Sequence, residues 1–500
     1  MWQPIAASDG GRPHVEHAAL VCSSCRNRKK RCDKTLPSCG YCVRKGLGCV
    51  YEEVRPRNHV SSALDSAQPV ATAHFIRLGP ISSEPELYLE VHRLIRATGQ
   101  FVDDVSVRYF QGFHRYLPFV SRTRFHSSLI TASMTPSASS SILLLAICLV
   151  TWYPKQKANP PPADRKSLYL ITRSLFAQVQ ALFPPSLHLI HAGILLAVYE
   201  YARGKQDVAF ASIASCARMA YAAGIHHSSR PFANLPKAAH VTDRDTNFRL
   251  QAEEANTWWG IIICERIISC DVTVHEQPLV TTIPNAAFRL PTEPELLEQS
   301  QIPSPESISP VSISCLNSVD IGAFGRSAQA AWLLDQVLKA FNIPSLDTKL
   351  LQLYEIDTDL QEFLGTLVHP CYNGTGVVCE TIAIAIRALF ALHWHILSQP
   401  PQSLNSRYGS LEDWCNRSDA ALDTTTKMVV DIVENNDNME SYSFDDVAPS
   451  YTYIIRASLA HIRRRTQAKP DSWLRSAKER LRVALEQFNH RWDLDSPHNT

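Results

Sequence analysis

The chain lacks two features of exported and membrane proteins: a secretory signal and an apolar segment long enough to cross a bilayer. Its longest apolar run, 142–152, is much shorter than a membrane-spanning helix, which needs about 20 residues. The segment 1–20 is polar and contains Gly, Pro and His, unlike a signal peptide. We therefore expect an intracellular protein without a membrane partner. In that reducing compartment, clustered cysteines are more often metal ligands than disulfides.

The chain also lacks an overall charge and the motifs of common enzymes. Its formal net charge is +1 over 500 residues, so attraction to a polyanion must come from a local patch. We find no Gly-rich phosphate loop, nucleophile elbow or acid/base constellation, and we expect no enzymatic activity. The close pairs His188/His191 and His393/His395 have no carboxylates at ligand spacing. We predict that these histidines are ordinary satisfied or exposed side chains.

What the chain does contain is a cluster of six cysteines between positions 22 and 49, in two halves of identical spacing: Cys22, Cys25 and Cys32, then Cys39, Cys42 and Cys49. Zinc takes four ligands in a tetrahedron. Two ions would need eight sulfur positions, so six cysteines suffice if two of them bridge both metals. A disulfide knot and another type of zinc ribbon are the alternatives. The reducing compartment disfavours the first, and the second often uses a histidine, which this span does not contain.

Eight basic residues lie within the cysteine span, against one acidic residue, Asp33. Those between Cys25 and Cys32 are predicted to fill one or two turns of a short helix that the thiolates hold at both ends. A rigid basic helix of this kind can read base edges in the major groove of DNA. A solvated charge run or a nuclear-import signal is the alternative. Pro37 is predicted to set the turn between the halves, and Gly46 and Gly48 to allow unusual dihedral angles.

The composition divides the chain into five parts. We predict a disordered N-terminus (1–20), a cysteine-rich DNA-binding domain (21–51), a Pro- and Ser-containing linker (52–85), a large all-α domain (86–493) and a short tail (494–500). A unit of about 30 residues is too small to fold without metal or disulfides. The linker contains no apolar heptads, so we predict no coiled coil, and the sequence leaves open whether the protein forms a homodimer.

Apolar periodicity predicts helices through most of the large domain. We expect a helical stripe from Val105 to Phe113 ending near Pro118, the core pair Trp258-Trp259, and Gly224 as a helix stop. The remaining expected helices cover 141–152, 187–201, 208–223, 253–270, 379–398 and 473–492. Loops are expected at 154–164, 291–310 and 431–446, the last favoured over an acidic activation segment. Cys148, Cys216, Cys264 and Cys270 are expected to be buried structural thiols.

The cysteine-rich span resembles the fungal Zn2Cys6 binuclear cluster of transcription regulators. The resemblance rests on Cys22-Ser-Ser-Cys25-Arg26-Asn-Arg28-Lys29-Lys30-Arg31-Cys32-Asp33, on Pro37-Ser-Cys39-Gly-Tyr-Cys42-Val-Arg44-Lys45-Gly46 and on Cys49. It implies two Zn²⁺ ions per chain, with Cys22 and Cys39 bridging them. Cys25 and Cys32 would complete one zinc site, and Cys42 and Cys49 the other.

The same resemblance implies contacts with double-stranded DNA. Lys29 would read the guanines of a CGG-type triplet, and Arg replaces the commoner Lys at position 31, which keeps the charge but alters the reach. Phosphate attraction would come from the other basic residues, namely Arg26, Arg28, Lys30, Arg31, Lys34, Arg44 and Lys45.

The helical region resembles the middle regulatory domain of the same family. The matching runs are 109–119, 217–226 and 258–266, with Thr257 departing from the Arg that often precedes the Trp pair. The resemblance implies a nuclear, sequence-specific transcription factor of the RNA polymerase II type that contacts the transcription machinery or co-regulators. It also suggests regulation of a metabolic, and specifically a secondary-metabolite, gene cluster. The alternatives are an enzyme or a protein-interaction domain tethered to DNA by a zinc cluster, and an RNA-binding module.

Overall fold

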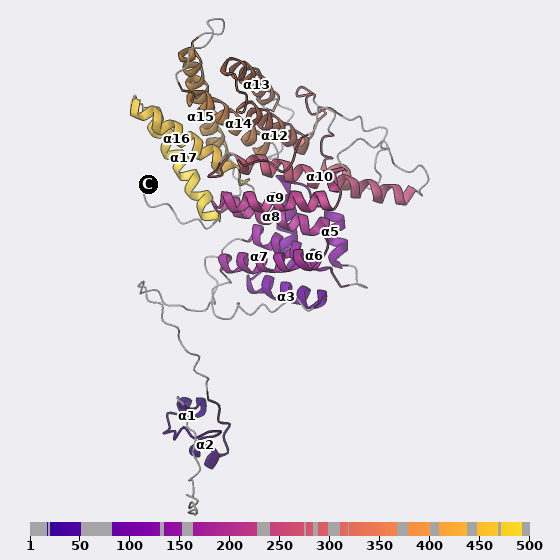
Figure 1. Ribbon diagram of the computed structural model, residues 1–500, viewed down its shortest axis with the longest axis vertical. Helices are drawn as coiled ribbons and strands as arrows, with labels where there is room; N and C mark the ends of the chain where they lie inside the picture. Colours follow the sequence, from indigo (N-terminus) through magenta and orange to yellow (C-terminus); the bar gives the residue numbers. More distant parts are fainter. Residues whose placement is uncertain are drawn as a thin grey trace, which may run out of the picture. The chain divides into compact units, whose positions relative to one another are not determined.

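The chain divides into two compact units, Met1–His74 and Phe75–Thr500, in a computed structural model (Figure 1). The residues described are 18, 21–51, 83–130, 135–152, 164–227, 241–274, 277–283, 289–298, 311–318, 320–367, 379–400, 410–437, 448–468 and 472–492. Apart from residue 18, the predicted disordered start (1–20) lies outside this set, as do most of the linker (52–82), the tail, the expected loop at 154–163 and residues 299–310. Helix α3 already begins at Glu84, inside the predicted linker.

The small unit contains two short helices, α1 (Ser23–Asn27) and α2 (Gly40–Lys45). Each begins directly after the first cysteine of its half. The sulfurs of Cys22 and Cys39 accept the backbone N–H groups of Cys25 and Cys42, respectively, and so cap the helix N-termini. Between the helices the Leu36–Pro37 peptide is cis. Of the two glycines expected to have unusual dihedrals, Gly46 has a φ of 60°, whereas Gly48 is absent from the positive-φ positions.

The prediction of a basic helix through Cys25–Cys32 was wrong. Helix α1 ends at Asn27, and Lys29 has a left-handed backbone conformation with a φ of 49°. The N–H of Lys30 bonds to the carbonyl of Cys25 (3.0 Å), and the N–H of Lys29 to that of Arg26 (3.2 Å). These two bonds form the Schellman pattern that ends a helix. The chain must turn back here because Cys32 has to return to the other thiols. Arg28, Lys29, Lys30 and Arg31 therefore lie on a turn and on the irregular segment that follows it instead of a helix.

The large unit is all-helical in the described residues, apart from an isolated bridge between Arg289 and Ser312. Its α-helices are α3 (Glu84–Ala97), α4 (Val102–Gln111), α5 (Arg122–Ile130), α6 (Ala138–Thr151), α7 (Arg165–Leu182), α8 (Leu187–Ala202), α9 (Gln206–Ala222), α10 (Val241–Ser269), α11 (Pro294–Glu298), α12 (Ala323–Ala340), α13 (Leu346–Leu367), α14 (Cys379–Leu397), α15 (Leu411–Asp437), α16 (Tyr451–Ala468) and α17 (Ser472–Trp492). Two 3-10 turns, η2 (Phe113–Arg115) and η3 (Ile225–His227), follow α4 and α9. The predicted fold class is confirmed.

Helices α6 and α8 form the centre of this unit, since nearly every residue of both is buried. Both are apolar on all sides, as expected of helices surrounded by others, and α3, α7 and α9 pack around them (Figure 1). Ser137 and Ser186 cap their N-termini. A Cβ on Gly193 of α8 would lie 2.6 Å from the sulfur of Cys216 on α9, so glycine is needed for this close approach. Gly224 has a φ of 75° just after α9, as the predicted helix stop requires.

Two expected loops are partly helical. Residues 431–437 form the end of α15, and α11 lies within the loop expected at 291–310. Residues 438–446 lie outside the described part. Helix α10 starts at Val241, well before the predicted position 253, because its polar first half has no apolar stripe to reveal it.

One helix segment, Glu380–Leu397 of α14, is long and apolar enough to cross a membrane by length and composition alone. In the structure 72% of this segment is buried by the rest of the protein. Its apolar surface is therefore covered by neighbouring helices, as in a core helix.

Candidate metal centre and nucleic-acid face

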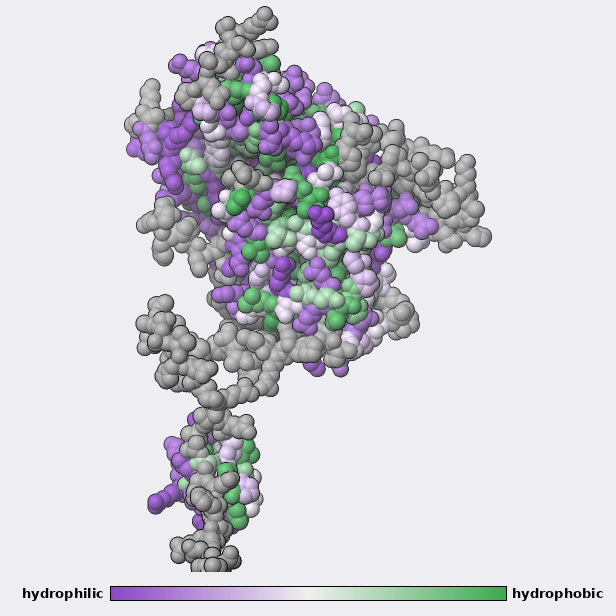
Figure 2. Space-filling view, in the orientation of Figure 1, coloured by the Kyte–Doolittle hydropathy of each residue, from purple (hydrophilic) through white to green (hydrophobic). Residues whose placement is uncertain are grey.

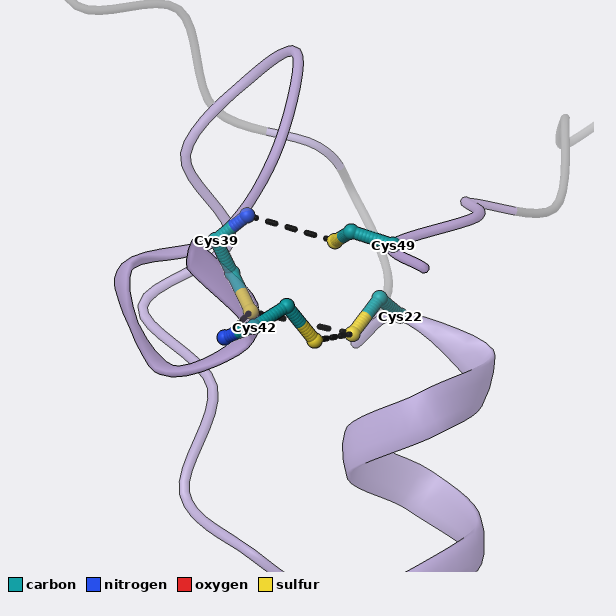
Figure 3. Close-up of side chains that lie close together, drawn as sticks. All are labelled: Cys22, Cys39, Cys42 and Cys49. Atoms are coloured by element: carbon teal, nitrogen blue, oxygen red, sulfur yellow. Dashed lines mark hydrogen bonds between the residues drawn. The ribbon is translucent and has the colours of Figure 1, made fainter. Parts of the chain in front are cut away.

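The structure brings all six predicted cysteines of the small unit together. Two groups of four thiols each have their sulfurs within 4.8 Å of one another. One group consists of Cys22, Cys25, Cys32 and Cys39, the other of Cys22, Cys39, Cys42 and Cys49. Cys22 and Cys39 belong to both groups, and Figure 3 shows the second group with its sulfurs converging.

The sulfur spacing fits tetrahedral zinc. With Zn–S bonds of about 2.3 Å, the edge of the sulfur tetrahedron is about 3.8 Å. The sulfur of Cys22 lies 3.8 Å from that of Cys39, 3.7 Å from that of Cys42 and 3.9 Å from that of Cys32. A disulfide would need an S–S distance of about 2.05 Å, and none of the six thiols is in a disulfide. The donors are soft sulfurs only, which suits zinc.

The two halves hold their thiols with the same local structure. Gly46 N–H bonds to the carbonyl of Val43 (3.3 Å), and Leu47 N–H to that of Cys42 (3.0 Å). These bonds repeat, in the second half, the pair that Lys29 and Lys30 form after α1. Gly46 and Lys29 are thus equivalent positions, and both have a left-handed backbone.

Asp33 joins the two halves. Both of its carboxylate oxygens accept the backbone N–H of Gly40 at the start of α2, at 3.1 and 3.0 Å. The same carboxylate accepts from the N–H and hydroxyl of Thr35, and the Gly40 N–H lowers the pKa of Asp33 below its usual value. Tyr51 donates to the Thr35 carbonyl (2.9 Å). The sequence offered only the charge of Asp33 and did not reveal this role.

Burial and hydrogen bonds together set the pKa values of the clustered thiols. Burial raises the pKa of Cys42 to about 12 and also raises that of Cys25. Burial raises the pKa of Cys32 as well, but backbone hydrogen bonds at Cys22 and Lys34 outweigh it and bring that pKa to about 7. Because zinc takes thiolates, binding must displace protons from the most buried sulfurs.

The predicted DNA-contacting side chains surround this cluster at the surface. Seven of them are exposed and Lys34 is partly buried; the exposed ones are Arg26, Arg28, Lys29, Lys30, Arg31, Arg44 and Lys45. Figure 2 shows hydrophilic residues gathered on one flank of the small unit and hydrophobic ones on the opposite flank. Val43 and Val50 are among the exposed apolar residues of the unit.

The other residues singled out from the sequence lie inside the large unit. Trp258 and Trp259 are buried in the core, as predicted. The imidazole of His188 lies 2.9 Å from the hydroxyl of Ser140, and that of His191 lies 2.7 Å from the hydroxyl of Thr257. Each of these imidazoles therefore has a hydroxyl group as a close neighbour. Cys148, Cys216 and Cys264 are buried and Cys270 is half-buried.

The comparisons with known proteins agree with this architecture. Residues 20–58 match the model of the fungal Zn(2)-Cys(6) binuclear cluster domain, which binds two zinc ions, and residues 107–331 match that of the fungal specific transcription factor domain. The chain belongs to the fungal Zn2Cys6 transcription factors.

Curated relatives carry names of the same kind. The chain is 28% identical to transcription factor BOA15 of Botryotinia fuckeliana over 26% of its own length and 70% of that protein. It is 40% identical to transcription factor AN6788 of Emericella nidulans over 11% of its length, and 30% identical to the aspyridones cluster regulator apdR of the same organism over 18%. The matches span only 8% and 12% of those two proteins. No solved structure matches the chain.

Proposed function

We propose that the protein is a sequence-specific DNA-binding regulator of transcription whose six clustered cysteines hold two zinc ions. Cys22 and Cys39 are the shared ligands, Cys25 and Cys32 complete one site, and Cys42 and Cys49 the other. The observation that carries the proposal is the pair of four-thiol groups with Cys22 and Cys39 in common. Bound zinc supplies the cross-links that a unit of this size cannot obtain from an apolar core.

Lys29 is the residue proposed to read a CGG-type triplet. Its backbone is left-handed, a conformation that costs a non-glycine residue about 1–2 kcal/mol. The equivalent position in the second half is Gly46, which adopts the same conformation without that cost. Backbone strain is commonly retained where a side chain serves function. Lys34 has a left-handed backbone as well, but it is partly buried, whereas the Lys29 side chain is exposed and its ammonium group can donate to guanine O6 and N7.

The surrounding basic residues are proposed to bind DNA phosphates. Seven of them, Arg26, Arg28, Lys30, Arg31, Lys34, Arg44 and Lys45, contribute positive charge from a small unit with one acidic residue in its cysteine span. Phosphate contacts position a protein without choosing sequence and weaken steeply with salt. A salt dependence that stayed flat would contradict this role.

We further propose that the protein works in the nucleus, contacts the transcription machinery or co-regulators through its helical unit, and controls a metabolic gene cluster. The similarity to a relative named as an aspyridones cluster regulator supports the last point. Expression profiling of a deletion strain should show a group of clustered biosynthetic genes responding. A scattered response without such a group would reject gene-cluster control and leave DNA binding untouched.

The function is tested by replacing Lys29 with glycine. Lys29→Gly keeps the left-handed turn, because glycine prefers it, and removes only the side chain with its ammonium group. We expect the variant to retain two zinc ions by elemental analysis. Its preference for CGG-containing duplex over scrambled duplex should fall by about 1–3 kcal/mol in competition binding assays.

The control is Lys30→Ala, which removes a neighbouring exposed charge. If Lys30 contacts a phosphate, its loss should weaken binding to both duplexes equally. The slope of the logarithm of the binding constant against the logarithm of the salt concentration should become shallower by about 1. If Lys29→Gly behaved like this control, the assignment of base reading to Lys29 would be wrong.

A further inference from the structure

A cavity of about 200 Å³ lies in the large unit between helices α13, α14 and α15, which Figure 1 shows together at one end of that unit. It lies in residues 332–500, which neither family model matches. Leu353, Leu392 and Ile396 form its apolar lining and are almost completely buried. The cavity therefore has an apolar floor in a part of the helical unit that neither family model covers.

The buried His393 and the half-buried Asp357 face one another in this cavity. His393 is 4% exposed, and its Nδ1 lies 3.3 Å from the hydroxyl of Ser418. Its Nε2 and Oδ1 of Asp357 approach within 3.4 Å, yet neither atom makes a hydrogen bond to any residue that the structure describes. The other Asp357 oxygen accepts from Gln361 at 3.0 Å. Buried polar atoms left in this state are costly, so the arrangement suits a ligand that satisfies both.

Aromatic and cationic side chains line the same cavity nearer the surface. The ring of Tyr354, which is 52% exposed, meets that of Trp414 edge-on at 6.1 Å between centroids. The guanidinium carbon of Arg417 lies 4.3 Å from the centroid of Trp414. Flat rings and an apolar floor favour a ring-shaped ligand.

We propose that this cavity binds a small uncharged ring compound that carries a hydroxyl group, of which phenols are the simplest class. The hydroxyl would donate to Oδ1 of Asp357 and accept from Nε2–H of His393. The Ser418 hydroxyl can donate to Nδ1 of His393, which leaves the proton on Nε2. A cavity of about 150 Å³ is known to hold benzene, so this one admits a single ring with small substituents.

The charges around the cavity select against ions. The Asp357 carboxylate repels a ligand carboxylate at the polar end, and Arg417 repels an amine near the surface. A neutral hydroxyl satisfies both unpartnered atoms without meeting either repulsion. This site goes beyond DNA binding and does not depend on it, since ligand binding is measured on the full-length protein without DNA.

The test is calorimetric titration of the full-length protein with three ligands of similar size: 4-methylphenol, toluene and 4-methylbenzoate. We expect 4-methylphenol to bind, toluene to bind at least about tenfold more weakly for want of a hydrogen bond to a charged group, and 4-methylbenzoate not to bind. Three results would each overturn the proposal: equal affinities for 4-methylphenol and toluene, tightest binding of 4-methylbenzoate, held by Arg417, or no binding of 4-methylphenol.

Variants locate the binding. Asp357→Leu and His393→Phe should each lower the affinity for 4-methylphenol about tenfold and leave that for toluene unchanged. Glu355→Leu makes a matching change at an exposed position of the same helix and should leave both affinities unchanged. An unchanged affinity of Asp357→Leu for 4-methylphenol would refute the site. If a variant does not fold, the comparison of the three ligands on the natural chain still tests the proposal. DNA binding of the same variants, measured separately, should remain as in the parent.

Discussion

Lys29 and Gly46 occupy equivalent places in the two halves of the small unit. Comparing them distinguishes what the backbone turn requires from what the side chain is proposed to do. The backbone requires a left-handed residue at both positions. The sequence indicated glycine flexibility at 46 but gave no sign that 29 shares the conformation, because a run of basic residues reports charge and not dihedral angles. The six thiols, by contrast, were predictable, since their repeated spacing follows from the number of ligands that zinc takes.

Gly40 should be required for the link between the two halves. A Cβ at this position would lie 2.5 Å from Oδ2 of Asp33, so Gly40→Ala must displace the carboxylate from the start of α2. We expect zinc affinity to fall about fivefold to tenfold, because folding of the unit and metal binding are coupled. Competition with a chromophoric chelator measures the change.

The matched control is Gly48→Ala in the same unit. A Cβ there meets nothing within 4 Å, and Gly48 has no left-handed φ, so this variant should bind zinc like the parent. Equal zinc affinity for both alanine variants would show that the Asp33 contact contributes nothing to the cluster.

At the scale of helices, apolar periodicity predicted the buried elements well and the polar ones poorly. Helices α6, α8, α9, α14 and α17 lie within a few residues of their predicted ranges. The end of α15 was mistaken for a loop because Asp431–Asp437 is rich in acidic and amide residues. There Val433 is buried and holds the segment against the core, a tertiary contact that local composition does not reveal. The prediction that His393 is a satisfied or exposed side chain likewise did not place it in a cavity, since sequence spacing says nothing about a cavity formed by three helices.

Glu380, in the first turn of α14, should destabilise the large unit at neutral pH. Burial raises the pKa of its carboxyl to about 7, although Ser450 donates a hydrogen bond to it. The folded chain therefore holds a proton that the unfolded chain releases above about pH 4.5, and stability is lost as the pH rises from 4.5 to 7. Glu380→Gln should be more stable than the parent by about 1–3 kcal/mol at pH 8.

The difference should shrink to near zero at pH 5, where the parent carboxyl is also protonated. Urea unfolding of both proteins at the two pH values measures it. A variant less stable than the parent at pH 8 would mean that the buried carboxylate is ionised and stabilised by its surroundings. That result would contradict a raised pKa for Glu380.

At the scale of the whole molecule, the two units have separate cores. One apolar cluster consists of the cysteines with Tyr41, Leu47 and Tyr51 packed against them, and another extends through the helices of the large unit. The sequence predicted this division from composition, because a short Cys-rich span and a long amphipathic region need different means of stabilisation.

Removing zinc should therefore unfold the small unit and spare the large one. Treatment with a chelator is expected to abolish DNA binding. The helical circular dichroism signal should change by less than about a tenth and its thermal midpoint by less than about 2 °C, because the large core contains none of the six clustered thiols. Readdition of zinc under reducing conditions should restore DNA binding. Loss of the helical signal on chelation would instead reveal that the two units depend on each other for folding.

The repeated half of the small unit also bears on how its surface can change over generations. The two halves share one backbone turn, and the left-handed position holds glycine in one half and a lysine with an exposed side chain in the other. Under the proposed base contact by Lys29, changes at Arg44 and Lys45 of the glycine copy would alter attraction to phosphates and not the choice of sequence. Under the same proposal, inherited variation at Lys29 would change which DNA sequences, and so which genes, the protein recognises.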